Sequence, residues 1–196
     1  LFFKKKKIWC ATSTHSGEEV FCLKTHLNLK KKLKNLITII IPRHIHRSSK
    51  IKKLCDKLNL TSQVLNTKDL IKKNKEIIII NSFGTASIYY KFSKIVFVGK
   101  SILKNLEKVG GQNPIEAATL GCKIYHGPYV SNFKEIYKLL NSFGIAQKIS
   151  NENDLLKNLI NDLKSSKKRT NVNKKIINLG KKILNNTVIE INKFLK

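Results

Sequence analysis

The feature that most constrains this chain is the alternation of short apolar runs with longer amphipathic segments over its first 150 residues. The apolar runs, such as LITIIIP at 36–42 and IIII at 77–80, are nearly continuous. Continuous apolar strands separated by helices are typical of a parallel sheet that helices cover on both faces. We therefore predict an α/β, Rossmann-like domain over residues 1–150. The expected strands are 8–12, 36–42, 63–65, 76–80, 94–98, 123–125 and 145–148, and the expected helices are 18–33, 48–58, 85–92, 113–120 and 132–142.

Beyond residue 154 the pattern becomes wholly helical, with apolar residues at helical spacing. We predict that residues 151–196 form a C-terminal extension of helices that pack on the domain. A basic amphipathic tail that lies on a membrane surface is the alternative. No apolar run is long enough to span a membrane.

The formal net charge of +27 raises the possibility of nucleic-acid binding. The lysines, however, are spread along the whole chain among many Ile and Asn residues, which is typical of an AT-rich genome. Arginines and aromatic residues, which read and stack on bases, are few. We therefore expect no nucleic-acid partner. A generally basic surface instead favours an anionic membrane face or an anionic substrate.

The four cysteines form no C-x-x-C pair, which argues against a zinc site or a thioredoxin-type site. We expect free, mostly buried thiols and no disulfide. The cysteines are Cys10, Cys22, Cys55 and Cys122.

The glycine-rich segment GGQNPIEAA at 110–118 follows an apolar strand and opens a predicted helix. Asn113 is a good N-cap, and Glu116 stands where it could complete a capping box. Such a helix start, at the carboxyl end of a strand, is also a place where phosphate groups bind. The segment alone favours capping slightly over binding.

Other strand ends carry similar residues, and ligands bind outside the carboxyl ends of parallel strands. His15 follows the first strand, within a segment where Ser16 and Glu19 fit a capping box. Arg43 ends the second strand, where its planar, charged fork suits a phosphate or carboxylate. Glycine turns with small polar residues follow the strands that end at residues 80 and 98. Several such loops on one sheet edge predict a binding site there.

A metal site is the other possibility that this edge raises, through the imidazoles of His44 and His46. No carboxylate cluster accompanies them, so we expect no metal.

Taken in order, the motifs S-T-H-x-G-E-E, P-R-H, F-V-G-x-S, G-G-x-N-P-x-E-A-A, G-P and N-F resemble the carboxyl half of bacterial 3-deoxy-D-manno-octulosonic acid (Kdo) transferases. The resemblance covers residues 7–150. It implies the single donor-binding domain of a two-domain glycosyltransferase of GT-B type.

The family resemblance also implies a reaction: the inverting, metal-independent transfer of Kdo from CMP-Kdo to a lipid A precursor in lipopolysaccharide biosynthesis, with no cofactor. It implies a peripheral location at the cytoplasmic face of the bacterial inner membrane. Carried over by motif, Arg43 would contact the CMP portion, and Asn113 and Glu116 would hold phosphate and ribose. The donor-binding residues so implied are Arg43, Gly84, Ser101, Gly110, Gly111, Asn113 and Glu116, with His15 and Glu18 in the cleft.

The chain departs from the family pattern in three places. NSFGTA stands at 81–86 where the family has D-T-M-G-E-L, Lys100 replaces a glycine, and Gln112 replaces a histidine. The G-E-x-W motif that carries the family's general base does not occur, so we expect no catalytic residue in this chain and poor transfer by the chain alone.

We expect further residues upstream because the sequence contains no methionine. The family resemblance implies that the amino-terminal acceptor domain is absent from this sequence. Three alternatives stay open from the sequence. They are another nucleotide-sugar glycosyltransferase of the same architecture, a basic binding module without catalysis, and an inactive remnant.

Overall fold

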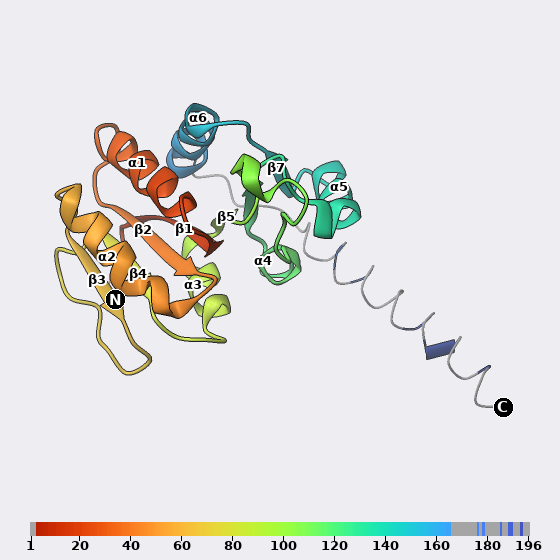
Figure 1. Ribbon diagram of the computed structural model, residues 1–196, viewed down its shortest axis with the longest axis horizontal. Helices are drawn as coiled ribbons and strands as arrows, with labels where there is room; N and C mark the ends of the chain where they lie inside the picture. The colour runs from red at the N-terminus through yellow and green to blue at the C-terminus, as the bar shows by residue number, and fades with distance from the viewer. Residues whose placement is uncertain are drawn as a thin grey trace.

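A computed structural model describes residues 3–165 and positions 176, 178, 185, 188, 189 and 193 of the chain. Seven parallel strands form one sheet in the order β3-β4-β2-β1-β5-β6-β7 (Figure 1). The strands are β1 Lys7–Thr14, β2 Leu36–Pro42, β3 Ser62–Leu65, β4 Ile77–Ile80, β5 Ile95–Val98, β6 Lys123–His126 and β7 Ala146–Lys148.

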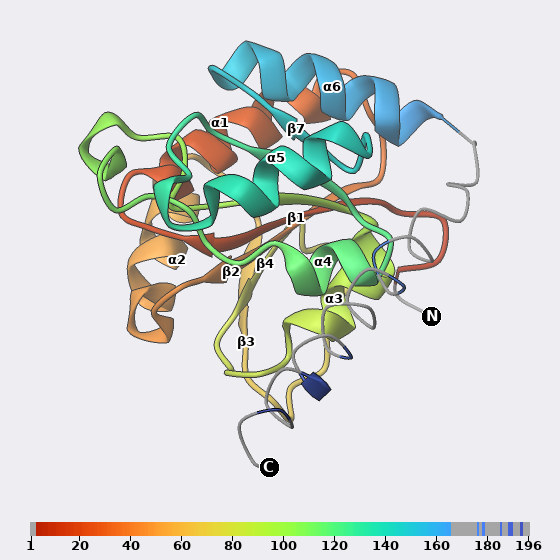
Figure 2. The same cartoon turned by 90° about the vertical axis from the view of Figure 1, so that its right-hand side faces the viewer.

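Helices cover both faces of the sheet, and Figure 2 shows α1 and α6 on one side with α3 and α4 on the other. The helices are α1 Glu18–Lys30, α2 Ser48–Lys57, α3 Ala86–Ser93, α4 Ile115–Thr119, α5 Lys134–Ser142 and α6 Glu152–Lys164. Three short 3₁₀ turns, which the sequence did not predict, are η1 Ile45–Arg47, η2 Lys104–Leu106 and η3 Ser131–Phe133. The predicted α/β, Rossmann-like fold is confirmed.

The strands are apolar along their whole length because both of their faces are buried. In β1, Ile8 and Cys10 face the core beneath α3, α4 and α5, whereas Trp9 and Ala11 face α1 and α6. This alternation follows from the period of two in a β-strand. A third cluster joins α2 and α1 to β2 and β4. All four cysteines are buried and free, as expected.

The C-terminal extension is described only in part. Leu155 and Leu159 of α6 are completely buried in the core beside α1, so this helix packs on the domain. Of the helices predicted beyond residue 165, the structure describes only positions 176, 178, 185, 188, 189 and 193, which are helical, and Ile176 packs against the core cluster that contains Ile8. No helix in the described part of the chain is long and apolar enough to cross a membrane.

Candidate functional site at the carboxyl edge of the sheet

The carboxyl edge of the sheet has its topological switch point at β1, which pairs with β2 on one side and β5 on the other. Two hydrogen bonds continue these pairings past the strands. The amide of Gly99 donates to the carbonyl of Thr12 at 2.8 Å, and the amide of Arg43 donates to the carbonyl of Thr14 at 3.1 Å. The loops after β1, β2 and β5 therefore lie side by side, where ligands bind in folds of this type.

The buried carboxylate of Glu18 organises these loops. Its Oε2 accepts the amides of His15 at 3.0 Å and Lys100 at 2.6 Å. Its Oε1 accepts the amides of Ser101 at 2.9 Å and Ile102 at 3.2 Å. Consecutive amides after a strand form a concave site that attracts anions. Here the protein's own carboxylate, which is completely buried, fills that site, so Glu18 lies beneath the surface of this edge, in contrast to its predicted place in the cleft.

Glu19 has a second structural role. Its buried carboxylate receives two hydrogen bonds from Arg47, at 2.9 and 3.0 Å, which tie η1 to α1. The capping box predicted for Ser16 and Glu19 is wrong, because α1 begins after Gly17 and has no side-chain cap. Tertiary partners outcompete the local pattern for both acidic residues.

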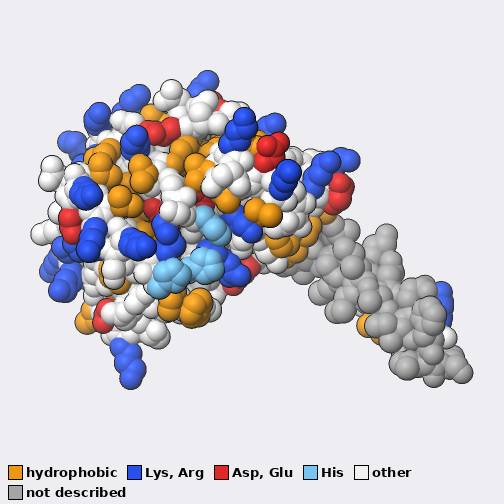
Figure 3. All heavy atoms as spheres, viewed as in Figure 1, with side chains coloured by type: hydrophobic (Ala, Val, Ile, Leu, Met, Phe, Trp, Pro, Cys, Tyr) orange, Lys and Arg blue, Asp and Glu red, His pale blue; other side chains and the backbone are white. Residues whose placement is uncertain are grey.

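Exposed cationic and imidazole side chains gather above this framework. The His15 and His44 rings lie 5.8 Å apart, and the His44 and His46 rings 5.6 Å apart. Figure 3 shows pale-blue histidine side chains as one patch among Lys and Arg side chains. Arg43 is exposed at the same edge and makes no ion pair with the residues that the structure describes. This edge therefore presents a guanidinium and several imidazoles to an anion.

The protonation state of His15 follows from its half-buried position. Burial lowers its pKa, and a hydrogen bond to the carbonyl of Ser13 opposes this shift only in part. His15 is therefore a neutral hydrogen-bonding group at pH 7. No group of three or more His, Cys, Asp or Glu side chains within the described residues could hold a metal ion.

Ser101 does not lie where its predicted role requires, which was to line the donor site with its hydroxyl group. Its side chain is completely buried, donates to the carbonyl of Val98 at 2.7 Å and accepts the amide of Gly127 at 2.9 Å. A Cβ on Gly127 would lie 2.0 Å from the carbonyl oxygen of Ser101. Ser101 therefore braces the loops after β5 and β6 from within.

The glycine pair at 110–111 lies beside the same loops. A Cβ on Gly110 would lie 2.3 Å from the carbonyl oxygen of Tyr129, so close packing of backbone requires this glycine. Gly111 has φ +95° and donates its amide to the carbonyl of Lys100 at 2.6 Å. These contacts bring the segment that opens α4 next to the loop after β5.

The predicted helix start at Asn113 is shorter than expected. The helix α4 has only five residues and its N-cap is Pro114, not Asn113 as predicted; the Asn113 side chain accepts a hydrogen bond from the amide of Ile115 at 2.9 Å. The expected return bond from Glu116 to Asn113 is not among the contacts of the described residues. Asn113 and Glu116 are both exposed, which leaves the carboxylate of Glu116 open to solvent. Since α4 is so short, its dipole is weaker than the sequence predicted.

Gly84 lies farther along the same edge. It is exposed with φ +72°, and a Cβ placed there would meet nothing within 4 Å. Strands β2 and β1 separate its loop from the loop after β5, which corresponds to about 14 Å at the usual strand spacing. The structure thus brings Arg43, His15, Gly110, Gly111 and Glu116 to one edge, with Gly84 at its end.

Two strained residues at this edge escaped the sequence analysis. Ser13 has φ 53° and Lys100 has φ 55°, both in the left-handed region that disfavours side chains. Ser13 also interrupts the register between β1 and β2. Strain of this kind concentrates at functional sites. No local sequence signal marks Ser13, whereas Lys100 stands where the family pattern has a glycine, the residue that adopts this conformation without strain.

Comparison with known proteins agrees with the resemblance seen in the sequence. No family model matches the chain. It is 31% identical over 167 residues to a 3-deoxy-D-manno-octulosonic acid transferase of Haemophilus influenzae, covering 85% of this chain and 38% of that protein. Proteins of the same name from Rickettsia conorii and Aquifex aeolicus are 31% and 27% identical, covering 85% and 84% of this chain and 35% and 44% of their own lengths. The chain thus spans less than half the length of these curated relatives.

The fold has a close counterpart among solved structures. The C-terminal CMP-Kdo binding domain of WaaA from Acinetobacter baumannii superposes with a TM-score of 0.73 over 93% of this chain and 91% of that one, at 20% identity. At this identity the likeness establishes the fold alone, and the sequence matches supply the family. The chain therefore belongs with the 3-deoxy-D-manno-octulosonic acid transferases, as a relative that matches one part of their length.

Proposed function

We propose that this chain is the donor-binding domain of a Kdo transferase and that CMP-Kdo binds at the carboxyl edge of the sheet. The sequence match to proteins of that name carries the proposal. Two further observations support it: the WaaA domain of the same fold is described as CMP-Kdo binding, and positively charged groups gather at this edge.

Different residues of this edge would contact different parts of the nucleotide sugar. Arg43 would pair with the CMP phosphate, since its fork suits a phosphate oxygen pair. Glu116 would accept from ribose hydroxyls, as Asn113 holds the phosphate at the start of α4. His15 would donate or accept as a neutral imidazole in the cleft. Gly110 and Gly111, which pack against the backbone of residues 129–130, would hold this segment in place beside the donor, and the donor would extend toward Gly84.

Departure of CMP places negative charge on its phosphate, and fixed donors near that phosphate would stabilise the charge. Arg43 is the group best suited to this role, so the proposed transfer needs no metal. Deprotonation of the acceptor hydroxyl is assigned to a general base outside this sequence. The acceptor is proposed to be a lipid A precursor, with inversion at the Kdo carbon, and the working place to be the cytoplasmic face of the inner membrane.

Isothermal titration calorimetry with CMP tests the proposal. Wild type should bind CMP and should bind UDP more weakly. Arg43→Ala and Glu116→Ala should each weaken CMP binding at least tenfold, which is the loss expected when the charged partner of a hydrogen bond is removed. Glu135→Ala is the matched control, because it removes an exposed glutamate from α5. No CMP binding by wild type, or equal affinity in all four proteins, would count against the donor-site assignment.

A further inference from the structure

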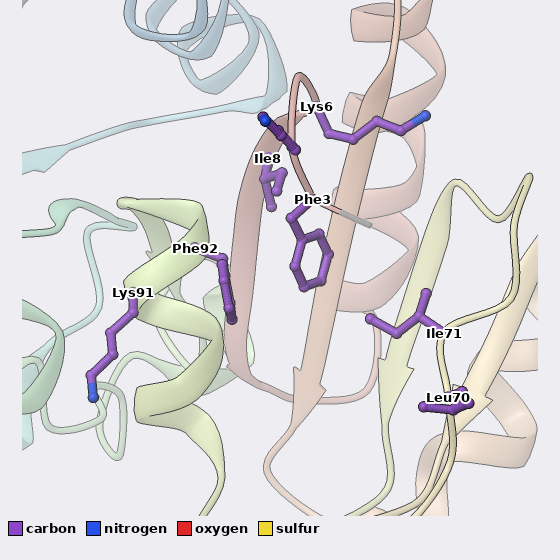
Figure 4. A pocket seen from close by; sticks show the side chains of 8 residues that line it. Phe3, Lys6, Ile8, Leu70, Ile71, Lys91 and Phe92 are labelled. Atoms are coloured by element: carbon purple, nitrogen blue, oxygen red, sulfur yellow. The ribbon is translucent and has the colours of Figure 1, made fainter. Parts of the chain in front are cut away.

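A cavity lies at the amino edge of the sheet, opposite the proposed donor site. It has a volume of about 780 Å³ and opens where the start of β1, the segment before β4 and the end of α3 meet (Figure 4). Phe3 and Phe92 form one wall, with ring centroids 4.9 Å apart. Ile8 and Ile71 complete the apolar lining. A cavity of this size is in the range that holds an organic ligand.

Apolar side chains extend from this cavity into solvent. Leu70 is 88% exposed and Phe92 50% exposed, and both line the cavity. Large apolar side chains gathered around an apolar hollow mark a surface that binds another molecule. A single exposed apolar residue does not indicate a binding surface, but Leu70 and Phe92 adjoin a cavity whose lining is itself largely apolar.

Lysines surround the apolar surface. Lys4, Lys6 and Lys91 line the cavity, and all three are exposed. More exposed lysines occur in the same segments, with Asp69 as their only exposed acidic residue; these lysines are Lys5, Lys68, Lys72 and Lys73. A partner for this surface must combine apolar groups with negative charge.

Like charge disfavours two other occupants of this cavity, both of them from the protein itself. A second copy of the chain carries a net charge of +27 and would meet a basic surface with its own. The C-terminal residues 166–196 are rich in lysine and contain one acid, Glu190. Both combinations place like charges together, which is unfavourable.

We propose that this cavity binds an acyl chain of an anionic membrane lipid, and that the surrounding lysines contact the anionic headgroups. Apolar insertion and lysine contacts together give stable attachment, whereas a single acyl chain is marginal. Because the cavity lies at the amino edge, a bilayer held there leaves the carboxyl edge free. The inference does not depend on which donor the carboxyl edge binds.

Vesicle co-sedimentation tests this inference with the full chain. One set of vesicles is pure phosphatidylcholine, and the other contains 30% phosphatidylglycerol. Wild type should bind the second set and not the first. The triple variant Lys4→Gln, Lys6→Gln, Lys91→Gln should weaken partitioning at least tenfold, because each lysine removed from a headgroup region weakens it by roughly fivefold.

A matched triple variant controls for net charge: Lys134→Gln, Lys138→Gln and Lys157→Gln remove three exposed lysines from α5 and α6. Equal losses in both triple variants would show diffuse electrostatic attraction and overturn the proposal. So would failure of wild type to sediment with either vesicle. CMP titration of the cavity variant keeps the two proposals apart, since its donor affinity should be unchanged.

The apolar contribution has its own test. Leu70→Ser with Phe92→Ser should weaken partitioning at least fivefold even in 0.5 M salt, where surface electrostatics are screened. Phe83→Ser removes a 72% exposed ring from the opposite edge and should change nothing. Unchanged binding by the double variant would overturn the cavity assignment. If the double variant unfolds at a lower urea midpoint than wild type, its loss of binding could come from instability, and the comparison of the two lysine triple variants then tests the proposal.

Discussion

Replacing Glu18 by glutamine tests whether one buried carboxylate holds the framework of the candidate site. Each carboxylate oxygen accepts two backbone amides: Oε1 from Ser101 and Ile102, and Oε2 from His15 and Lys100. Glutamine keeps one oxygen and replaces the other with an NH₂ group, which can only donate. In either orientation two of these four amides, which are buried or partly buried, therefore face another donor.

The expected loss follows from these four bonds. A buried amide left without an acceptor costs about 1–3 kcal/mol, so two orphaned amides correspond to about 4 kcal/mol. That is a large fraction of the stability of a single domain, which is about 5–15 kcal/mol. Glu18→Asp keeps the charge on a shorter side chain and should lose less.

Urea unfolding followed by tryptophan fluorescence measures this loss directly. Trp9 is the only tryptophan, and it is completely buried in β1, so its fluorescence reports unfolding of the core. Glu135→Gln, on the exposed face of α5, should stay within about 0.5 kcal/mol of wild type. A Glu18→Gln protein that loses less than about 1 kcal/mol would refute the view that this carboxylate anchors the loop after β5.

Three further predictions concern stability. Burial lowers the pKa of His26 and His126, with hydrogen bonds offsetting only part of the shift. The unfolded chain therefore takes up protons first as the pH falls below about 6.5, and urea midpoints should decrease from pH 7 to pH 5; a flat profile would contradict this. Gly127→Ala should cost about 3 kcal/mol or abolish folding, because its Cβ would overlap a backbone carbonyl, and a wild-type thermal midpoint would disprove that clash. Arg47→Ala should lower the free energy of unfolding in urea by about 3–5 kcal/mol, because it leaves the buried carboxylate of Glu19 without its charged partner; a loss under 1 kcal/mol would show that the pair is unimportant.

The sheet could be predicted from the sequence because its signal is local. Runs such as 36–42 and 77–80 are apolar throughout, and each must be buried on both faces wherever it lies. The grouping of Arg43 and His15 at one edge then followed from a rule about parallel sheets, since carboxyl ends of strands share an edge. No knowledge of distant contacts was needed for either conclusion.

The roles of the acidic residues at 18–19 could not be predicted, because their partners are distant in sequence. Glu18 bonds to amides 82 to 84 residues away, and Glu19 to an arginine 28 residues away. The local pattern instead favoured a capping box with Ser16. For the same reason the sequence attributed the glycines at 110–111 to ligand access, when the backbone of residues 129–130 already requires them.

The buried carboxylates also restrict where an anion can bind at this edge. Two places in such folds commonly attract phosphate: the start of the first helix and the amides of a loop after a strand. Glu18 and Glu19 occupy the first turn of α1, and the Glu18 carboxylate fills the amides after β5. An added phosphate at either place would meet negative charge. Arg43 carries an exposed cation at the same edge without an acid paired to it among the described residues, so we propose that the phosphate of a bound nucleotide lies against Arg43 and at neither of these two places.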